Sequence, residues 1–409
     1  MKAFFKLFVV ALALIVASCG SKYQYETVPG DLLNTKIYTL DNGLKVYMSV
    51  NPDQPRIQTY IAVKVGAKND PSETTGLAHY FEHLMFKGSE QFGTSDYASE
   101  KVLLDQIEKE FEVYRTLTDE AERAAAYKVI DSLSYEASKY SIPNEYDKLM
   151  AAIGAQGTNA YTSYDQTVYV EDIPSNQIDT WAKIQADRFK NNVIRGFHTE
   201  LETVYEEKNM SLTQDSRRVL EAMLAALFPN HPYGQQSVLG TQEHLKNPSI
   251  TNIKNYHKEW YVPNNIAICV SGDFNPDEMV AAIEKYWGDF QPNKNLKKLE
   301  FKAEEPLTAP EKVVLEGQEA PFLYIAWRLP AANSKDMPAL TVLENILNNG
   351  STGLIDVNIN QAQKVLGGAS GGVNTFVDHS CFVLTGRPKQ GQTLEQVEGL
   401  LMEQIAKLK

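Results

Sequence analysis

Cysteine is scarce in this chain: three occur in 409 residues, and two of them lie beyond the N-terminal segment. Cys269 and Cys381 sit in the strand-like apolar runs IAICVSG and SCFVLTG. We expect two buried free thiols there, rather than a disulfide or a thiolate metal site. Positive charge is also in deficit, since 39 Lys and Arg stand against 52 Asp and Glu. The chain therefore lacks the basic face that nucleic-acid binding needs, and we expect no nucleic-acid partner.

Long apolar runs are lacking beyond the N-terminus, so the sequence predicts no membrane-spanning helix. At the N-terminus, Lys2 and Lys6 precede the run LFVVALALIVA, which is typical of a secretory signal peptide over residues 1–18. The ending VASC resembles a bacterial lipobox, in which Cys19 becomes the lipid-modified N-terminus. This pattern predicts a lipoprotein held at a membrane surface of the bacterial cell envelope, or exposed to the periplasm. Plain secretion with cleavage near Ser18 is the alternative.

The rest of the chain divides into segments of different character. Residues 19–35 are polar and predict a tether. Residues 36–290 alternate strand-like runs with helical segments, and a charged, proline-flanked linker over 291–306 leads to a second region, 307–409. Apolar residues recur at helical spacing over 99–150, which predicts a helical hairpin insertion. An ordinary pair of core helices fits the same pattern.

The two regions resemble each other in sequence. HYFEHLMFKGS, which begins at His79, aligns with TVLENILNNGS, which begins at Thr341. Upstream, TYIAVKVGAKND aligns with LYIAWRLPAANS, and downstream SYDQTVYV aligns with FVDHSCFVL. Three matches in the same order predict a tandem duplication of one α+β unit, with a mixed or antiparallel sheet and helices packed on one face. The stretch matching residues 200–290 has no counterpart in the second region, so the second copy is expected to be incomplete.

The segment His79-Tyr80-Phe81-Glu82-His83 carries the strongest chemical signal. In a helix predicted over 77–87, His79 and His83 are four residues apart, so both rings lie on one face and can reach one cation. Imidazole suits zinc, and Glu82 can stand beside the metal and take a proton from a metal-activated water. The alternative is a solvated helix face with two incidental histidines. The helix is largely apolar, however, and burying these polar groups costs free energy unless they are paired or bound to metal.

This H-x-x-E-H arrangement is the inverzincin pattern, and the chain resembles the pitrilysin/insulysin family of zinc metallopeptidases. The segment ELETVYEEKN, from Glu200, resembles the part of the family that supplies the third ligand. The resemblance implies one zinc ion with three protein ligands, His79, His83 and Glu207. It implies further that Glu200 is an accessory acid and Glu82 the general base. A charged, exposed helix face is the alternative for this segment, and Glu206 is a rival ligand. Ligand type alone does not distinguish zinc from manganese or cobalt.

Two further features follow from the resemblance. GTNAYTSYDQT resembles the family's substrate-pairing edge strand, which implies that Asn159 and Ala160 bind the peptide main chain by β-augmentation. A turn-forming Asn and a small packing residue are the alternative. In the second copy, Thr341 and Asn345 replace the two histidines, so only the first copy can hold the metal. The family's substrate-gripping Arg and Tyr have no evident counterpart in this sequence.

The function implied is that of a zinc-dependent endopeptidase that hydrolyses peptides or unfolded polypeptides, with Glu82 as general base. Three alternatives remain open. The chain could be the metal-bearing subunit of a two-chain peptidase that needs a partner subunit, or a missing C-terminal half, for activity. It could be a module with a structural metal, although a structural site would not need Glu82. It could also be an interaction scaffold that uses the helical hairpin.

Overall fold

The computed structural model describes residues 23–408, which form an α+β fold. Strands are β1 (Glu26–Thr27), β2 (Lys36–Thr39), β3 (Lys45–Val50), β4 (Arg56–Val63), β5 (Gln156–Thr162), β6 (Thr167–Pro174), β7 (Ile266–Gly272), β8 (Leu323–Leu329), β9 (Ser370–Asn374) and β10 (Ser380–Gly386). Helices are α1 (Leu77–Leu84), α2 (Tyr97–Tyr114), α3 (Glu120–Ser138), α4 (Glu145–Ala152), α5 (Ile178–Lys190), α6 (Phe197–Leu212), α7 (Asp215–Leu227), α8 (Pro232–Gln235), α9 (Gln242–Leu245), α10 (Ile250–Trp260), α11 (Pro276–Trp287), α12 (Met337–Leu347) and α13 (Leu394–Lys407). No helix among residues 23–408 is both long and apolar enough to cross a membrane.

Contacts divide the described chain into two units. The first combines residues 23–65, 77–201 and 247–298, and the second combines 66–76, 202–246 and 299–408. Residues 202–246 therefore pack with the C-terminal region, whereas the sequence assigned them to the first domain. The boundaries predicted from the sequence stay predictions. So does the signal peptide, which lies outside the described residues.

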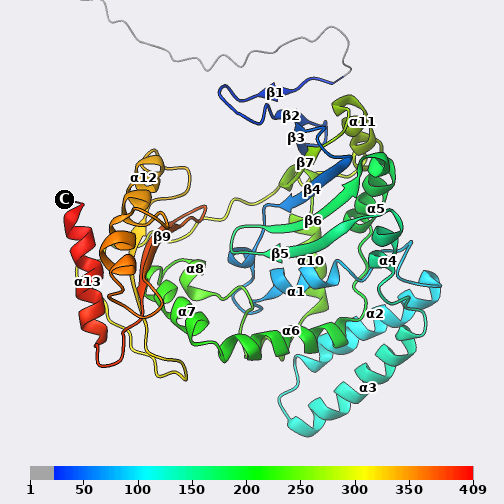
Figure 1. Ribbon diagram of the computed structural model, residues 1–409. Coiled ribbons are helices and arrows are strands. Elements are labelled where there is room, and N and C mark those ends of the chain that lie inside the picture. The colour runs from blue at the N-terminus through cyan, green and yellow to red at the C-terminus, as the bar shows by residue number, and fades with distance from the viewer. Residues whose placement is uncertain (1–22, 409) are drawn as a thin grey trace, which may run out of the picture. The chain divides into compact units, whose positions relative to one another are not determined.

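A seven-stranded sheet forms the centre of the first unit, in the order β1-β2-β3-β7-β4-β6-β5 (Figure 1). β3 and β7 run parallel while the other neighbours run antiparallel, so the sheet is mixed, as predicted. Side chains of β4 alternate: Ile57, Thr59, Ile61 and Val63 are buried, and those between them are not. One face of the sheet is therefore covered and the other is partly open.

Helices cover one face of this sheet, as the sequence predicted. The ring of Tyr169 on β6 lies 5.3 Å from that of Phe189 on α5 and 6.2 Å from that of Phe86, which follows α1. Both helices therefore pack on the face that carries Tyr169. The opposite face explains one wrong prediction: Cys269 of β7 is a free thiol but only half-buried, because it lies on the open face beside Tyr60. Cys381 is free and buried, as expected.

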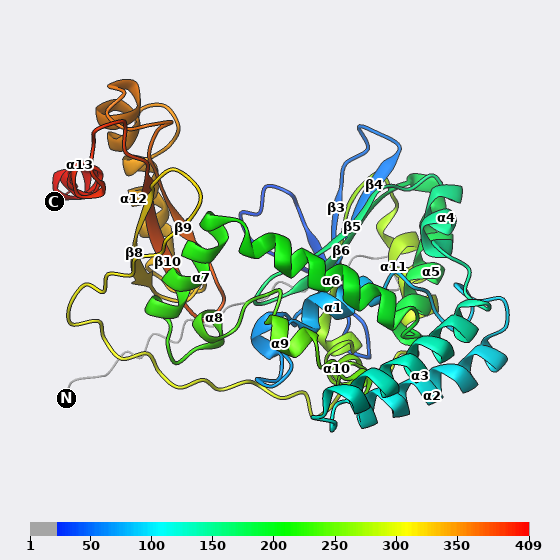
Figure 2. The ribbon, with the colours of Figure 1, turned by 90° about the horizontal axis from the view of Figure 1, so that it is seen from below.

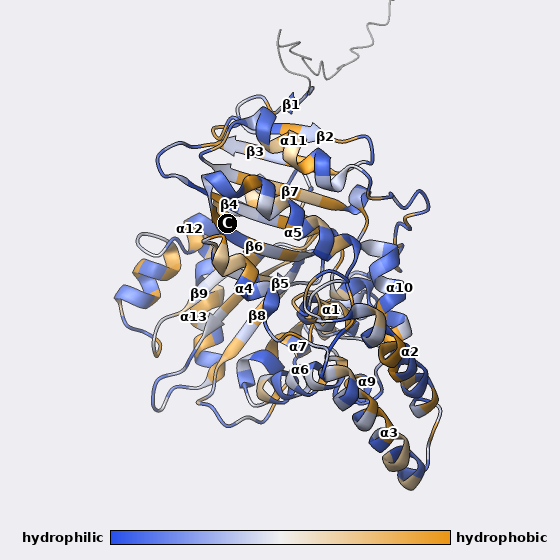
Figure 3. Ribbon diagram, turned by 90° about the vertical axis from the view of Figure 1, so that its right-hand side faces the viewer, coloured by the Kyte–Doolittle hydropathy of each residue, from blue (hydrophilic) through white to orange (hydrophobic). Residues whose placement is uncertain are grey.

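The predicted helices of segment 99–150 are α2 and α3, which pack together as a hairpin (Figure 2). Both show mixed blue and orange colouring, as amphipathic helices do (Figure 3). A buried ion pair fastens α2 to the rest of the unit. The Arg195 guanidinium donates two hydrogen bonds to the Glu100 carboxylate, at 2.6 and 2.8 Å, and another to the carbonyl of Lys87 at 2.8 Å. Arg195 thus joins α2 to the segment just after α1.

We expect Glu100→Gln to destabilise the protein by about 3–5 kcal/mol, because it leaves the Arg195 charge buried without a counter-charge. Both side chains are at most 4% exposed. The matched control is Asp105→Asn, which breaks an exposed ion pair with Lys101 on the same helix and should cost less than about 1 kcal/mol. Urea unfolding of the three proteins measures the difference. Equal midpoints for Glu100→Gln and Asp105→Asn would contradict this role of the pair.

The second unit contains a three-stranded antiparallel sheet in the order β8-β10-β9. Leu347, Ile355, Leu384, Val397 and Leu401 belong to the core packed against it. The first unit has the same motif: β4, α1, β5, β6 and α5 occur in this order, with α2, α3 and α4 between α1 and β5. In its sheet, β4, β6 and β5 are neighbours in that order. In the second unit the corresponding elements occur in the order β8, α12, β9, β10 and α13. Element order and strand order therefore support the predicted duplication.

Candidate metal centre

Helix α1 carries the H-x-x-E-H segment. Its apolar side chains Leu77, Ala78, Phe81 and Leu84 are buried, which fixes the rotation of the helix. The regular helix ends at Leu84, three residues before the predicted end, and tighter turns lead to Gly88, whose φ of 105° only glycine adopts easily. His79 and His83 lie on the side of α1 that remains half-buried.

The two histidine rings face each other. Their Nε2 atoms are 3.3 Å apart and their ring centroids 4.7 Å apart. Two nitrogens bound to one tetrahedral zinc ion, each at about 2.0–2.1 Å, would be about 3.3–3.4 Å apart. Burial, together with the neighbouring His83, lowers the pKa of His79 to about 4. The His79 ring is therefore neutral at pH 7, which is the form that binds a metal. The pair fits a zinc ion.

Helix α6 brings a carboxylate to the other side of His83. Glu200 Oε1 is 2.8 Å from His83 Nδ1, which leaves Nε2 facing His79. The second Glu200 oxygen pairs with Lys87. Burial would raise the pKa of Glu200, but the hydrogen bonds with His83 and Lys87 hold it below its usual value. An ionised carboxylate on the far nitrogen orients a ligating histidine, so Glu200 has the position of a residue that supports a ligand.

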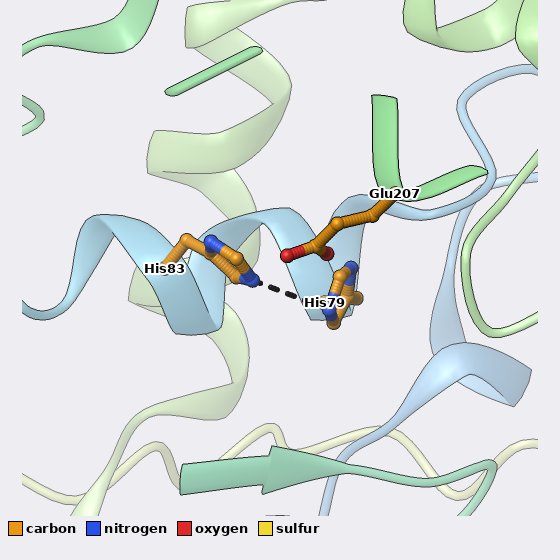
Figure 4. A group of neighbouring side chains, drawn as sticks. All are labelled: His79, His83 and Glu207. Carbon is orange, nitrogen blue, oxygen red and sulfur yellow. Dashed lines mark hydrogen bonds between the residues drawn. The ribbon is translucent and has the colours of Figure 1, made fainter. Parts of the chain in front are cut away.

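Glu207 lies two turns further along α6, on the same face as Glu200. One ligand atom from each of His79, His83 and Glu207 lies within 4.8 Å of the others, and Figure 4 shows the three side chains turned toward one another. This is the one group of three such residues found among residues 23–408. The rival Glu206 is exposed, and one of its oxygens accepts a hydrogen bond from Asn209. Two histidines and a glutamate form a donor set that zinc uses at catalytic sites.

Glu82 is 7% exposed and is not a member of this group of three. Its Oε2 accepts a hydrogen bond of 2.5 Å from the hydroxyl of Thr162, at the end of β5. Sequence reasoning missed Thr162, because only the packing of α1 against β5 brings the two together. It also missed Lys87, although its spacing of four residues from His83 in the helix predicted over 77–87 gave a signal.

β5 is an edge strand: it is last in the sheet order and pairs with β6 on one side. Asn159 is exposed, and its side-chain oxygen accepts a hydrogen bond of 2.9 Å from the backbone N–H of Ala160. The strand therefore has the free edge that the sequence assigned to Asn159 and Ala160. Their binding role is a prediction, and Cys19 lies outside the described residues.

The equivalent helix of the second repeat carries no such group among the described residues 299–408. Thr341, Glu344 and Asn345 lie on α12, and the Thr341 hydroxyl and the Asn345 amide bond backbone carbonyls of their own helix. The Glu344 carboxylate accepts a hydrogen bond of 3.2 Å from the backbone N–H of Val373 on β9. The polar side chains at the positions of His79, Glu82 and His83 thus bond backbone groups in the second repeat.

Comparison with known families covers most of the chain. The family "Insulinase (Peptidase family M16)" matches residues 45–105 and 129–242, and "Peptidase M16 inactive domain" matches residues 249–409. The chain belongs to the M16 peptidase family. The M16 match leaves residues 106–128 uncovered, at the tip of the α2–α3 hairpin, where the sequence predicted an insertion.

Individual M16 relatives are distant. The "Uncharacterized zinc protease YmxG" of Bacillus subtilis is 22% identical, and the match covers 91% of this chain and 78% of that protein. The "Probable mitochondrial-processing peptidase subunit beta" of Schizosaccharomyces pombe is 25% identical over 64% of this chain and 47% of its own length. The M16 chain is therefore homologous, at low identity, to zinc proteases.

Solved structures show the same fold. A protease from Helicobacter pylori superimposes with a TM-score of 0.74 at 20% identity, covering 91% of this chain and 79% of the other. Pitrilysin superimposes with a TM-score of 0.63 at 18% identity, covering 94% of this chain and 38% of pitrilysin. The α+β fold predicted from the sequence is thus confirmed as pitrilysin-like.

Proposed function

We propose that this M16 chain is a zinc-dependent endopeptidase that hydrolyses peptides or unfolded polypeptides. The observation that carries the proposal is the meeting of His79, His83 and Glu207, with the buried carboxylate of Glu82 on the same helix turn as His83. Two imidazoles and one carboxylate leave a fourth position open at a tetrahedral zinc ion, which a catalytic site requires and a structural site does not.

A zinc ion held there would lower the pKa of a water molecule and polarise the scissile carbonyl. Glu82 would take the proton from that water and pass it to the leaving amine. Thr162 donates a hydrogen bond from its hydroxyl to Glu82 Oε2, which orients the carboxylate. Glu200 would keep the His83 ring in a fixed orientation during the reaction, because its carboxylate is hydrogen-bonded to His83 Nδ1.

The substrate would bind along β5 as an added strand. Such β-augmentation binds an extended peptide through hydrogen bonds to its main chain and therefore tolerates many side chains. This mode of binding suits a peptidase for unfolded chains. The backbone N–H of Ala160 donates a hydrogen bond to the Asn159 side chain, whose place an incoming peptide carbonyl would take. The neighbouring end of the strand holds Thr162, and thus brings the peptide toward Glu82.

The alternative is a metal-bearing subunit that needs a partner for activity. The S. pombe relative, which is named as a subunit of a mitochondrial-processing peptidase, favours it, since a subunit implies an assembly. In addition, none of residues 299–408 belongs to the metal group. Substrate contacts from another subunit would then complete the site.

The experiment is cleavage of a quenched fluorescent peptide library by the purified chain, before and after chelation and after return of zinc. We expect cleavage that chelation abolishes and zinc restores. Metal binding without cleavage would favour the two-subunit alternative, which co-purification and mixing with M16 homologues of the same organism would then test. Cleavage that survives complete removal of metal would contradict the proposal.

Location is a separate proposal. We propose, on the sequence VASC alone, that Cys19 is lipidated and that hydrolysis takes place at a membrane surface of the bacterial cell envelope. Mass spectrometry of the mature N-terminus tests it. A diacylated cysteine at position 19 is expected, and an unmodified N-terminus near residue 19 would indicate plain secretion.

A further inference from the structure

The loop that leads into the metal-bearing helix packs with the second unit. Residues 66–76 connect β4 to α1, and their contacts place them in the unit that contains residues 202–246 and 299–408. The start of α1, and with it His79, therefore depends on anchors supplied by that unit. Two anchors hold the loop, one at each end.

The first anchor lies next to α1. The hydroxyl and backbone N–H of Thr75 both lie near His244 Nδ1, at 2.8 and 3.2 Å. A side chain on Gly240 would lie 2.2 Å from the carbonyl oxygen of Thr75, so the two backbones are in direct contact. This contact fixes the last residues of the loop, and the sequence HPYGQQSVLGT already contained the glycine that it needs.

The second anchor is an ion pair at the start of the loop. Lys68 Nζ lies 2.6 Å from Asp378 Oδ2, with side chains 13% and 33% exposed. Asp378 belongs to the turn between β9 and β10. Its backbone N–H donates to the Tyr233 hydroxyl at 3.1 Å, and that hydroxyl lies 3.4 Å from the carboxylate. The Tyr233 hydroxyl thus contacts both the backbone and the carboxylate of Asp378, and the same carboxylate contacts Lys68.

Lys68 is the cation that neutralises this carboxylate. His231 Nε2 is also near, at 3.5 Å from Asp378 Oδ2, but burial lowers the pKa of His231 to about 4 and makes it neutral at pH 7. Burial would raise the pKa of Asp378, but Lys68 and its neighbours hold it below the usual value. A half-buried charge pair of this kind is stronger than an exposed one, because solvent screens it less.

We propose that Asp378 is a positioning residue for the metal centre: its ion pair with Lys68 holds the loop that sets the start of α1 and hence the place of His79. The inference rests on the proposed function of that centre. In this proposal the second repeat supports the metal centre, because the turn between β9 and β10 contacts the loop that precedes α1. Asp378 is not itself a member of the metal group.

The test uses the full chain with Asp378→Asn, which keeps the size and the contact with Tyr233 but removes the charge. A double variant, Lys68→Asp with Asp378→Lys, reverses the pair. The control is Glu395→Gln, which breaks an exposed ion pair with Lys312 in the same unit. Three quantities are measured: zinc affinity by competition with a chelator, hydrogen exchange of residues 66–78, and kcat and KM for a peptide.

For Asp378→Asn we expect faster exchange over residues 66–78, zinc affinity lower by about three- to ten-fold, and a fall in kcat with KM near wild type. The reversed pair should recover part of each loss, which a generally damaged fold would not do. The inference would be overturned if the hydrogen exchange and zinc affinity of Asp378→Asn equalled those of Glu395→Gln. It would also be overturned if the losses in the reversed pair were as large as the sum of the losses from the two single charge changes. If the wild type binds zinc without cleaving peptides, the proposed function fails, while zinc affinity and exchange still decide this inference.

Discussion

Replacing Glu82 with glutamine should abolish most peptide hydrolysis while leaving the zinc content unchanged. An amide cannot take a proton from water, and a positioned general base contributes about 10²–10⁴-fold to rate. Glutamine has the same shape and can still accept the hydrogen bond from Thr162, so the fold around α1 should persist. We expect kcat to fall by about that factor, with one zinc per chain in both proteins. Peptide kinetics and metal analysis of the same samples measure both quantities.

The second repeat offers a matched control for this variant. Glu344 stands where Glu82 stands, on the equivalent helix, but it bonds the backbone of Val373 and has no metal group beside it. Glu344→Gln should therefore leave kcat and zinc content at wild-type values. A Glu82→Gln protein that cleaves peptides as fast as Glu344→Gln would remove Glu82 from the mechanism and leave the base unidentified.

The second large effect concerns the third ligand. Glu207→Ala should lower zinc affinity by more than the about 10–100-fold that losing a residue behind a ligand typically costs, because a direct ligand disappears. Hydrolysis should be lost with it. Chelator competition measures the affinity, and unfolding curves should stay close to wild type, since Glu207 is only half-buried at the helix surface.

Glu206→Ala is the neighbouring control on the same helix. Glu206 is exposed and bonds Asn209, so its removal should not change zinc affinity measurably. The two variants together decide between the residues that the sequence left as rivals. Loss of zinc in Glu206→Ala with retention in Glu207→Ala would reverse the assignment and require a different rotation of α6.

The parts of this site that sequence reasoning could predict are the local ones. Residues four apart on a helix share a face whatever the fold, so His79 and His83 could be paired from the sequence alone. The duplication was also readable, because its three matches keep their order and the structure repeats the same strand order. By contrast, the choice between Glu206 and Glu207 depends on how α6 is rotated, which the helical pattern left open.

The parts that could not be predicted are non-local. Thr162 meets Glu82 only because β5 packs beside α1, and Asp378 meets Lys68 across more than three hundred residues of chain. The alternating pattern of β7 showed a strand but not that one face of the sheet is partly open, so the half-burial of Cys269 was missed.

The most direct test of the account is a crystal structure of the zinc-loaded chain, with anomalous diffraction measured on both sides of the zinc absorption edge. We predict one strong zinc peak, about 2.0–2.2 Å from the Nε2 atoms of His79 and His83 and from a carboxylate oxygen of Glu207. Glu82 should lie beside the peak without binding it. A zinc-soaked crystal with no peak at these three side chains, or with its strongest peak elsewhere, would contradict the account.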